Sequence, residues 1–146
     1  MDAIEQAIAR AAAKAGPAMA TNFVHADLVM SPAEFRAFWG ESRLCAVGTV
    51  GKSSWPHAAP TDVQLNGDVF VVPSFSNAVR ISDLRTNARL SLTTWDDGNH
   101  AAIVYGTSSF DEGSAETMIR IKIHPARIYA IRAPAGHAAS RIFAPA

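Results

Sequence analysis

Pro73-Ser-Phe-Ser-Asn-Ala-Val-Arg-Ile-Ser-Asp-Leu-Arg-Thr-Asn-Ala-Arg-Leu-Ser-Leu92 is the stretch of sequence that decides the fold of this chain. It lies between two apolar segments, 69–72 and 90–95, which their composition predicts to be β-strands. A short helix is expected between them, over 77–86. The sequence therefore predicts a strand, a helix and a second strand in close succession.

Polar side chains gather where this helix is expected to begin. Ser74, Ser76, Asn77 and Arg80 supply two hydroxyls, an amide and a guanidinium. A helix N-terminus favours an anion because its first N–H groups are unpaired and its dipole is positive there. Arginine adds a charged donor that suits phosphate. The pattern predicts a site for the phosphate end of a nucleotide-like cofactor, and the alternative is an ordinary capped helix whose Arg80 lies in solvent.

Composition and charge limit the class of protein. The chain has 146 residues, 49% of them apolar and 18% charged, which indicates one globular domain over 1–146. Thirteen basic and thirteen acidic side chains cancel, so charge favours neither nucleic acid nor an anionic membrane as a partner. No apolar run approaches the roughly 20 residues of a membrane-spanning helix, and the first residues do not resemble a secretion signal. We expect a cytoplasmic protein.

Cysteine and histidine patterns give no metal site. Cys45 is the single cysteine, in an apolar segment, so no disulfide can form within the chain. The five histidines are scattered, and no pair has the i, i+4 spacing of a helical metal site. We expect no metal centre, and no residue is assigned a catalytic role.

Two further helices are expected before the strands begin. Residues 2–15 are rich in alanine, and a narrow apolar stripe recurs at helical spacing within an N-terminal extension over 1–20. This stripe predicts packing on a surface, for which a partner subunit is one candidate, and the alternative is a segment that frays in solution. A second helix is expected over 31–40, with Ser31 as its cap and Glu34 placed for a capping box. Phe35, Phe38 and Trp39 then form a core-facing stripe.

The rest of the chain alternates short apolar segments with turns. Asn66-Gly67 is a strong hairpin signal and predicts a type I′ turn. Pro125 is expected to end one strand before another begins at Ile128. Strands of even spacing with only short helices predict a mainly β protein, a small antiparallel barrel. The strands are expected at 44–50, 55–65, 68–73, 89–95, 101–110, 117–124 and 128–132.

With these segments in order, the chain resembles the FMN-binding split-barrel family that includes pyridoxamine 5′-phosphate oxidase. Residues 44–60 resemble the opening hairpin of that family, whose second strand carries Pro-His-x-x-Pro, here Pro56 to Pro60. Residues 70–92 resemble its phosphate-binding strand, helix and strand, and 102–107 resemble the strand that follows. The resemblance covers about 44–110. It implies a six-stranded antiparallel split barrel of Greek-key type with peripheral helices.

The resemblance also implies a cofactor and an assembly. Family members commonly bind FMN at a homodimer interface, so Arg80, Ser74, Ser76 and Asn77 are expected at the phosphate. Three residues of the second strand are expected along one flank of the flavin ring, where small side chains allow close approach. Trp95 and the neighbouring loop, including Asp96 and 98–100, are candidates to reach the partner subunit's flavin, or else form a surface turn. The three second-strand residues are Ala59, Pro60 and Thr61.

The chain departs from the oxidase itself at its C-terminal end. Only His137 and Arg141 occur where that enzyme has the arginine- and histidine-containing segment that holds pyridoxine phosphate. The resemblance therefore implies a flavin-dependent oxidoreductase with a small-molecule electron donor and acceptor, and not vitamin B6 oxidation. A module that only binds or stores flavin is the alternative. Deazaflavin and haem, which occur on similar barrels, are alternative ligands.

Overall fold

The structure is a computed structural model, and it describes residues 1–14, 28–111 and 117–132. Six antiparallel strands close into a barrel in the order β1-β2-β3-β6-β5-β4. Because β4 returns to pair with β1, the first four strands have the spatial order 4-1-2-3 of a Greek key. The expected mainly β fold is confirmed. The strands are β1 (Ser42–Val50), β2 (Pro56–Asn66), β3 (Val69–Phe75), β4 (Arg89–Trp95), β5 (His100–Asp111) and β6 (Met118–Arg132).

The barrel is open along part of β2. This strand pairs with β1 from Pro56 to Gln64, but it pairs with β3 only from Gln64 to Asn66. Strand β3 pairs with β2 only over Val69–Val71, whereas it pairs with β6 from Phe70 to Phe75. The first half of β2 therefore has hydrogen-bonded strand neighbours on one side only, which is the split that the resemblance implies.

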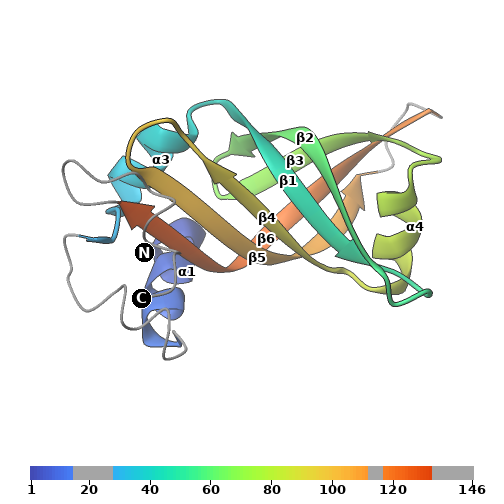
Figure 1. The fold of residues 1–146 in the computed structure, drawn as a ribbon, viewed down its shortest axis with the longest axis horizontal. Coiled ribbons are helices and arrows are strands. Elements are labelled where there is room, and N and C mark those ends of the chain that lie inside the picture. The colour runs from blue at the N-terminus through green and yellow to red at the C-terminus, as the bar shows by residue number, and fades with distance from the viewer. Residues whose placement is uncertain (15–27, 112–116, 133–146) are drawn as a thin grey trace.

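In the part of the chain that the structure describes, three helices lie against the barrel, and Figure 1 shows their places. Helix α4 (Val79–Thr86) lies at the end of the barrel where β2 and β3 separate. Helix α3 (Pro32–Trp39) lies near the opposite end, and Ser31 caps it by accepting a hydrogen bond from the N–H of Glu34. The predicted N-cap is confirmed. The expected capping box is incomplete, because the Glu34 carboxylate pairs with Arg132 on β6.

Helix α1 (Ala3–Ala13) packs on the barrel of its own chain, against β6. Ile4 and Ile8 belong to the main hydrophobic core, and the Nε of Arg10 donates to the carbonyl of Ala126 at 2.7 Å. The apolar stripe is thus covered within the subunit. The predicted packing on a surface is confirmed, but the surface is β6 of the same subunit, so a partner's surface and a fraying segment are both wrong. Sequence periodicity does not reveal which surface an apolar stripe covers.

Two local expectations are corrected. Pro125 does not end a strand: β6 continues through it, and the register shift opposite, between Tyr105 and Gly106, accommodates the residue that cannot donate a ladder hydrogen bond. The hairpin after β2 is confirmed, but Gly67 and Asp68 are its central residues. Only Gly67 has a positive φ, 62°, so the turn lacks the two positive φ values of type I′.

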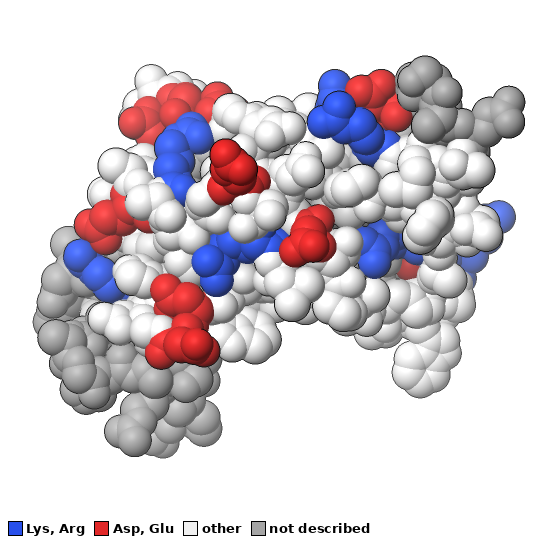
Figure 2. All heavy atoms as spheres, turned by 90° about the horizontal axis from the view of Figure 1, so that it is seen from above, with Lys and Arg blue, Asp and Glu red and all other residues white. Residues whose placement is uncertain are grey.

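The core fills the barrel and extends under α1 and α3. Phe35, Trp39 and Phe70 pack edge to face at its centre, as the aromatic stripe predicts. Among the described residues, no helix is both long and apolar enough to cross a bilayer. Acidic and basic side chains are interspersed over the face drawn in Figure 2, in keeping with the zero net charge.

Candidate functional site

A pocket of about 140 Å³ lies where the β1–β2 hairpin meets the start of α4. Strands β1 and β2 bring their register partners Val47 with Ala59 and Thr49 with His57 to this wall. Helix α4 begins soon after β3, and its first residues line the pocket opposite the hairpin. The pocket is lined by Val47, Thr49, His57, Ala59, Ala78, Val79 and Arg80.

Arg80 carries a charge that nothing in the described structure neutralises. Its guanidinium is half-buried, and it has no hydrogen bond or ion pair to any described residue. Burial lowers the pKa of Arg80, because desolvation disfavours its charged form. A cation that is partly shielded from water and has no counter-charge favours the binding of an anionic ligand.

The start of α4 adds backbone donors to the same wall. The N-cap residue Ala78 makes no side-chain cap hydrogen bond. The N–H groups of Val79 and Arg80 have no backbone acceptor among the described residues, whereas those of Ile81 and Ser82 donate to the carbonyl of Ala78. Unpaired amides at a helix N-terminus beside a free guanidinium favour a phosphate group.

Asp83, one turn after Arg80, fastens α4 to the hairpin. Its side chain is buried, and Oδ2 accepts hydrogen bonds from the Oγ1 of Thr49 at 2.8 Å and the Nδ1 of His57 at 2.6 Å. Burial opposes ionisation of Asp83, but the hydrogen bonds from His57 and Thr49 outweigh it and lower its pKa. The network therefore joins a carboxylate on α4 to both strands of the hairpin.

A second pocket, of about 340 Å³, lies along β1, β2 and β4 at the level of Ala46. Leu44 and Trp95, which border it, are each 66% exposed. Arg43 stacks on Phe38 with 4.1 Å from guanidinium carbon to ring centroid, and it donates to the carbonyl of Trp95 at 3.1 Å. Large exposed apolar side chains beside a pocket indicate a surface that another molecule covers.

The free half of β2 connects the two pockets. Ala59 lines the first and its neighbour Pro60 lines the second. Between Pro56 and Asp62 no residue is fully buried, on either face of the strand. One edge of this stretch pairs with β1 and the other edge is free. A flat ring can approach the free edge closely where the side chains are small, as at Ala59.

The predicted site residues fall into three groups. Arg80 and Ala59 meet in the first pocket, and Pro60 and Trp95 meet in the second. Thr61 lies on β2 without lining either pocket. The remaining three line neither of these two pockets and do not cap α4: Ser74 is buried in β3, and Ser76 and Asn77 are exposed before the helix.

The loop after Trp95 is closed by its own hydrogen bonds. Asp96 accepts from the N–H groups of Gly98 and His100 and from the Nδ1 of His100, the last at 2.9 Å. Burial opposes ionisation of Asp96, but these hydrogen bonds lower its pKa. The local structure is that of a surface turn, and a role toward a partner subunit stays a prediction. His137 and Arg141 lie outside the described residues.

Sequence reasoning missed His57, Thr49 and Asp83. His57 stands inside the Pro-His-x-x-Pro motif, and Asp83 follows Arg80 by three residues, so both share a helix or strand face with a predicted site residue. These spacings were signals, but only the packing of α4 on the hairpin shows that the three side chains touch.

Comparison with known proteins identifies the class. The family model described as pyridoxamine 5′-phosphate oxidase matches residues 31–139, so the chain belongs to this family. Comparison with the curated proteins finds no match.

Solved structures share the fold at low sequence identity. A conserved hypothetical protein, Rv2991, from Mycobacterium tuberculosis is 17% identical with a TM-score of 0.67, over 74% of this chain and 88% of that one. The haem storage protein HutZ from Vibrio cholerae is 13% identical with a TM-score of 0.56, over 68% and 91%. A protein named F420 reductase is 12% identical with a TM-score of 0.56, over 64% and 94%.

Proposed function

We propose that this protein is an FMN-binding flavoprotein that acts as an oxidoreductase on a small molecule. The observation that carries the proposal is Arg80, a half-buried guanidinium without a partner in the described structure, set in a pocket beside unpaired helix amides. Membership of the family supports the same ligand, since its members commonly bind flavin. We also propose a cytoplasmic location.

The residues present fit the phosphate end of FMN. Arg80 and the N–H groups of Val79 and Arg80 would hold the phosphate, with Ser76 and Asn77 exposed nearby. Ser74 is buried in β3 and does not line the pocket, so we leave it out of the contacts. The ring end is proposed along the free edge of β2, at Ala59, Pro60 and Thr61.

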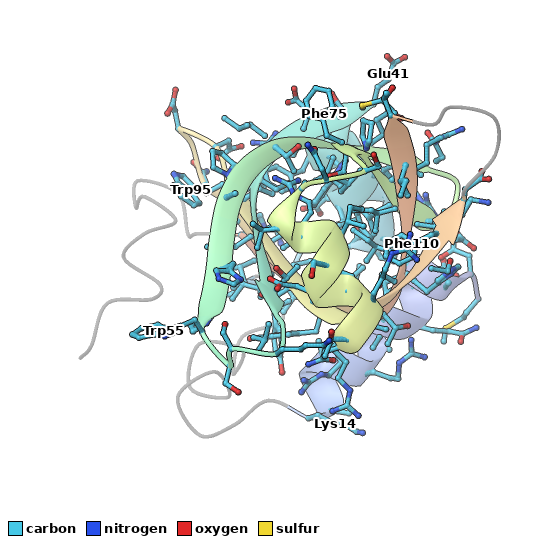
Figure 3. All side chains as sticks on the ribbon, turned by 90° about the vertical axis from the view of Figure 1, so that its right-hand side faces the viewer. Lys14, Glu41, Trp55, Phe75, Trp95 and Phe110 are labelled. Atoms are coloured by element: carbon cyan, nitrogen blue, oxygen red, sulfur yellow. The ribbon has the colours of Figure 1, made fainter. Side chains whose placement is uncertain are left out.

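The assembly we propose is a homodimer that covers the second pocket. Leu44 and Trp95 are exposed there, on the face of β1 and β4. Figure 3 shows Trp55 and Trp95 projecting away from the barrel on the same side. A second copy would remove this apolar surface from water and would place Trp95 near the cofactor of its partner.

Bound flavin supplies hydride and electron transfer, and the protein binds and orients it. A reduced nicotinamide is the proposed donor and a small organic molecule the acceptor. The lining of the two pockets contains no carboxylate among its described residues. This does not weigh against the proposal, because the cofactor carries the redox chemistry.

The alternative is a non-catalytic module that binds or stores flavin, deazaflavin or haem. His57, half-exposed in the pocket, is the observation that favours this view, because imidazole is a common haem ligand. The names of two structures with this fold, a haem storage protein and an F420 reductase, refer to the same ligands.

Absorbance titrations test the proposal. Purified protein is mixed with FMN, deazaflavin or haem, and we expect a shifted flavin band and one FMN per subunit. Tighter binding of haem or deazaflavin than of FMN would favour the alternative. The FMN complex is then mixed anaerobically with NADPH and NADH. Bleaching of the flavin supports the oxidoreductase. Flavin that stays oxidised with both donors, and that no small acceptor reoxidises faster after chemical reduction, would leave a binding module.

A further inference from the structure

Among the described residues that line the pocket, His57 is the one ionisable side chain besides Arg80, and its hydrogen bond to Asp83 limits what it can do. Its Nδ1 lies 2.6 Å from the Oδ2 of Asp83, and about two-fifths of its side chain is exposed. Asp83 accepts a second hydrogen bond from Thr49 on the same oxygen and is 5% exposed. The histidine ring is thus fixed at one nitrogen and open at the other.

The state of Asp83 decides which nitrogen of His57 carries the proton. Burial opposes ionisation of Asp83, but the hydrogen bonds from His57 and Thr49 lower its pKa, so it is a carboxylate at neutral pH. A carboxylate only accepts, so Nδ1 must donate. In neutral imidazole the second nitrogen, Nε2, then has a bare lone pair, whereas in the protonated ring it carries a proton.

A phosphate oxygen in this pocket would interact differently with neutral and with protonated His57. It repels a lone pair and attracts an N–H donor, so it binds next to protonated His57 and is disfavoured by the neutral ring. The charged groups around the ring are few. Helix α4 contributes Arg80 and Asp83, β1 contributes Thr49 and Val47, which do not titrate, and Lys52 in the β1–β2 turn is exposed and outside the pocket lining.

We propose that Asp83 positions His57 as a second cationic contact of the anion site, so that binding of a phosphate group is coupled to uptake of one proton by His57. Arg80 is then the permanent charge of the site and His57 the charge that responds to pH. By linkage, affinity for the phosphate group is highest where His57 is protonated and falls as pH rises. This inference rests on the proposed FMN site and adds its regulation by pH.

The test is calorimetric titration of the whole protein with FMN at pH 7.5, in buffers of different ionisation enthalpy, which counts protons taken up. Wild type is expected to take up about one-half to one proton more than His57→Gln. The phosphate of FMN also titrates near this pH, and the comparison with the variant removes that contribution. His124→Gln is the matched control, since His124 is exposed on β6 and contacts Ser109.

Asp83→Asn tests the positioning role. An amide can either donate or accept, so His57 is no longer forced to donate from Nδ1, and proton uptake should fall toward the His57→Gln value. A role of Asp83 in folding alone would lower stability and leave proton uptake per bound FMN unchanged.

The ratio of wild-type to His57→Gln affinity for FMN should also fall between pH 6 and 8, by up to about tenfold per pH unit.

Equal proton uptake in wild type and His57→Gln, with FMN bound by both, overturns this inference and leaves the proposed function standing. If FMN does not bind, the proposed function fails, and inorganic phosphate becomes the probe. Movement of the His57 ring resonances toward those of a charged imidazole at constant pH, on addition of phosphate, then supports the inference. Resonances that do not move overturn it as well.

Discussion

Gly51 lets helix α4 approach the β1–β2 hairpin closely. A Cβ at this position would overlap the Oδ1 of Asp83 and lie 3.2 Å from its Cα, so either the carboxylate or the helix backbone would have to move. Asp83 is already fixed by Thr49 and His57. A single missing side chain therefore permits the network that closes one wall of the pocket.

Gly51→Ala should destabilise the protein by about 1–3 kcal/mol, the usual cost of forcing a group into a packed site. Urea unfolding followed by circular dichroism measures it. Gly98→Ala is the control, because a Cβ there meets only Asp96 atoms at ordinary contact distance, 3.6 Å or more, and should change stability by less than about 0.5 kcal/mol. Equal stability of the two variants would show that α4 does not sit against Gly51.

Single residues also show the limit of prediction from sequence. The place of Arg80 at the start of α4 was predictable, and its use at a phosphate stays a prediction that rests on the anion preference of a helix N-terminus. The burial of Ser74 was not predictable, because β3 extends past the predicted end at residue 73 and successive strand residues face opposite sides of the sheet. Here α4 begins at Val79, and Ser74 is the last buried residue of β3.

At the scale of elements, α4 is attached to the barrel through both apolar and polar contacts. Ile81 and Leu84 are its buried apolar residues, and Asp83 supplies the hydrogen bonds to β1 and β2. Because hydrogen bonds to a charged group contribute roughly 1.5–3 kcal/mol, the ionisation state of Asp83 affects the docking of this helix.

Asp83→Asn should lower stability at pH 7 by about 1–3 kcal/mol. The pKa of Asp83 is lowered in the folded protein, so its contribution is complete above the ordinary carboxyl pKa of about 4 and is lost as pH falls below it. The stability gap between wild type and variant should therefore narrow from pH 5 to pH 3 in urea titrations. Asp97→Asn, at an exposed loop position, is the control. A gap that stays constant over this range contradicts the assignment.

The positions of the strands and helices followed from the sequence because apolar periodicity and turn residues are local properties, whereas the six-stranded Greek-key barrel followed from the resemblance to a family. The continuity of β6 through Pro125 did not, because it depends on a shift in the pairing of β6 with β5, where Tyr105 pairs with Arg127 and Gly106 with Pro125. The packing of α1 on β6 could not be predicted either. Both depend on a neighbouring element that is distant in sequence.

At the scale of the whole molecule, several large apolar side chains remain exposed on one subunit. Trp55 is 70% exposed and Phe75 67%, beside Leu44 and Trp95 at 66% each. Such side chains on the surface of a small protein favour association.

The protein should sediment as a dimer at micromolar concentration. Leu44→Glu and Trp95→Glu each place a charge in the proposed interface and should shift the sedimenting species toward monomer, because burying an unpaired charge is costly. Thr107→Glu, at an exposed position of β5, is the control and should stay dimeric. A wild-type monomer at this concentration would remove the shared site.

We propose that Arg80 holds the phosphate of FMN. The most direct measurement compares the affinities of FMN and riboflavin, which lacks the phosphate, for wild type, Arg80→Ala and the exposed-site control Arg89→Ala. A charge-assisted contact of roughly 1.5–3 kcal/mol predicts that Arg80→Ala weakens FMN about tenfold to a hundredfold and leaves riboflavin unchanged. Arg89→Ala should bind both as wild type does. Unchanged FMN affinity in Arg80→Ala, or an equal loss for riboflavin, would contradict the account.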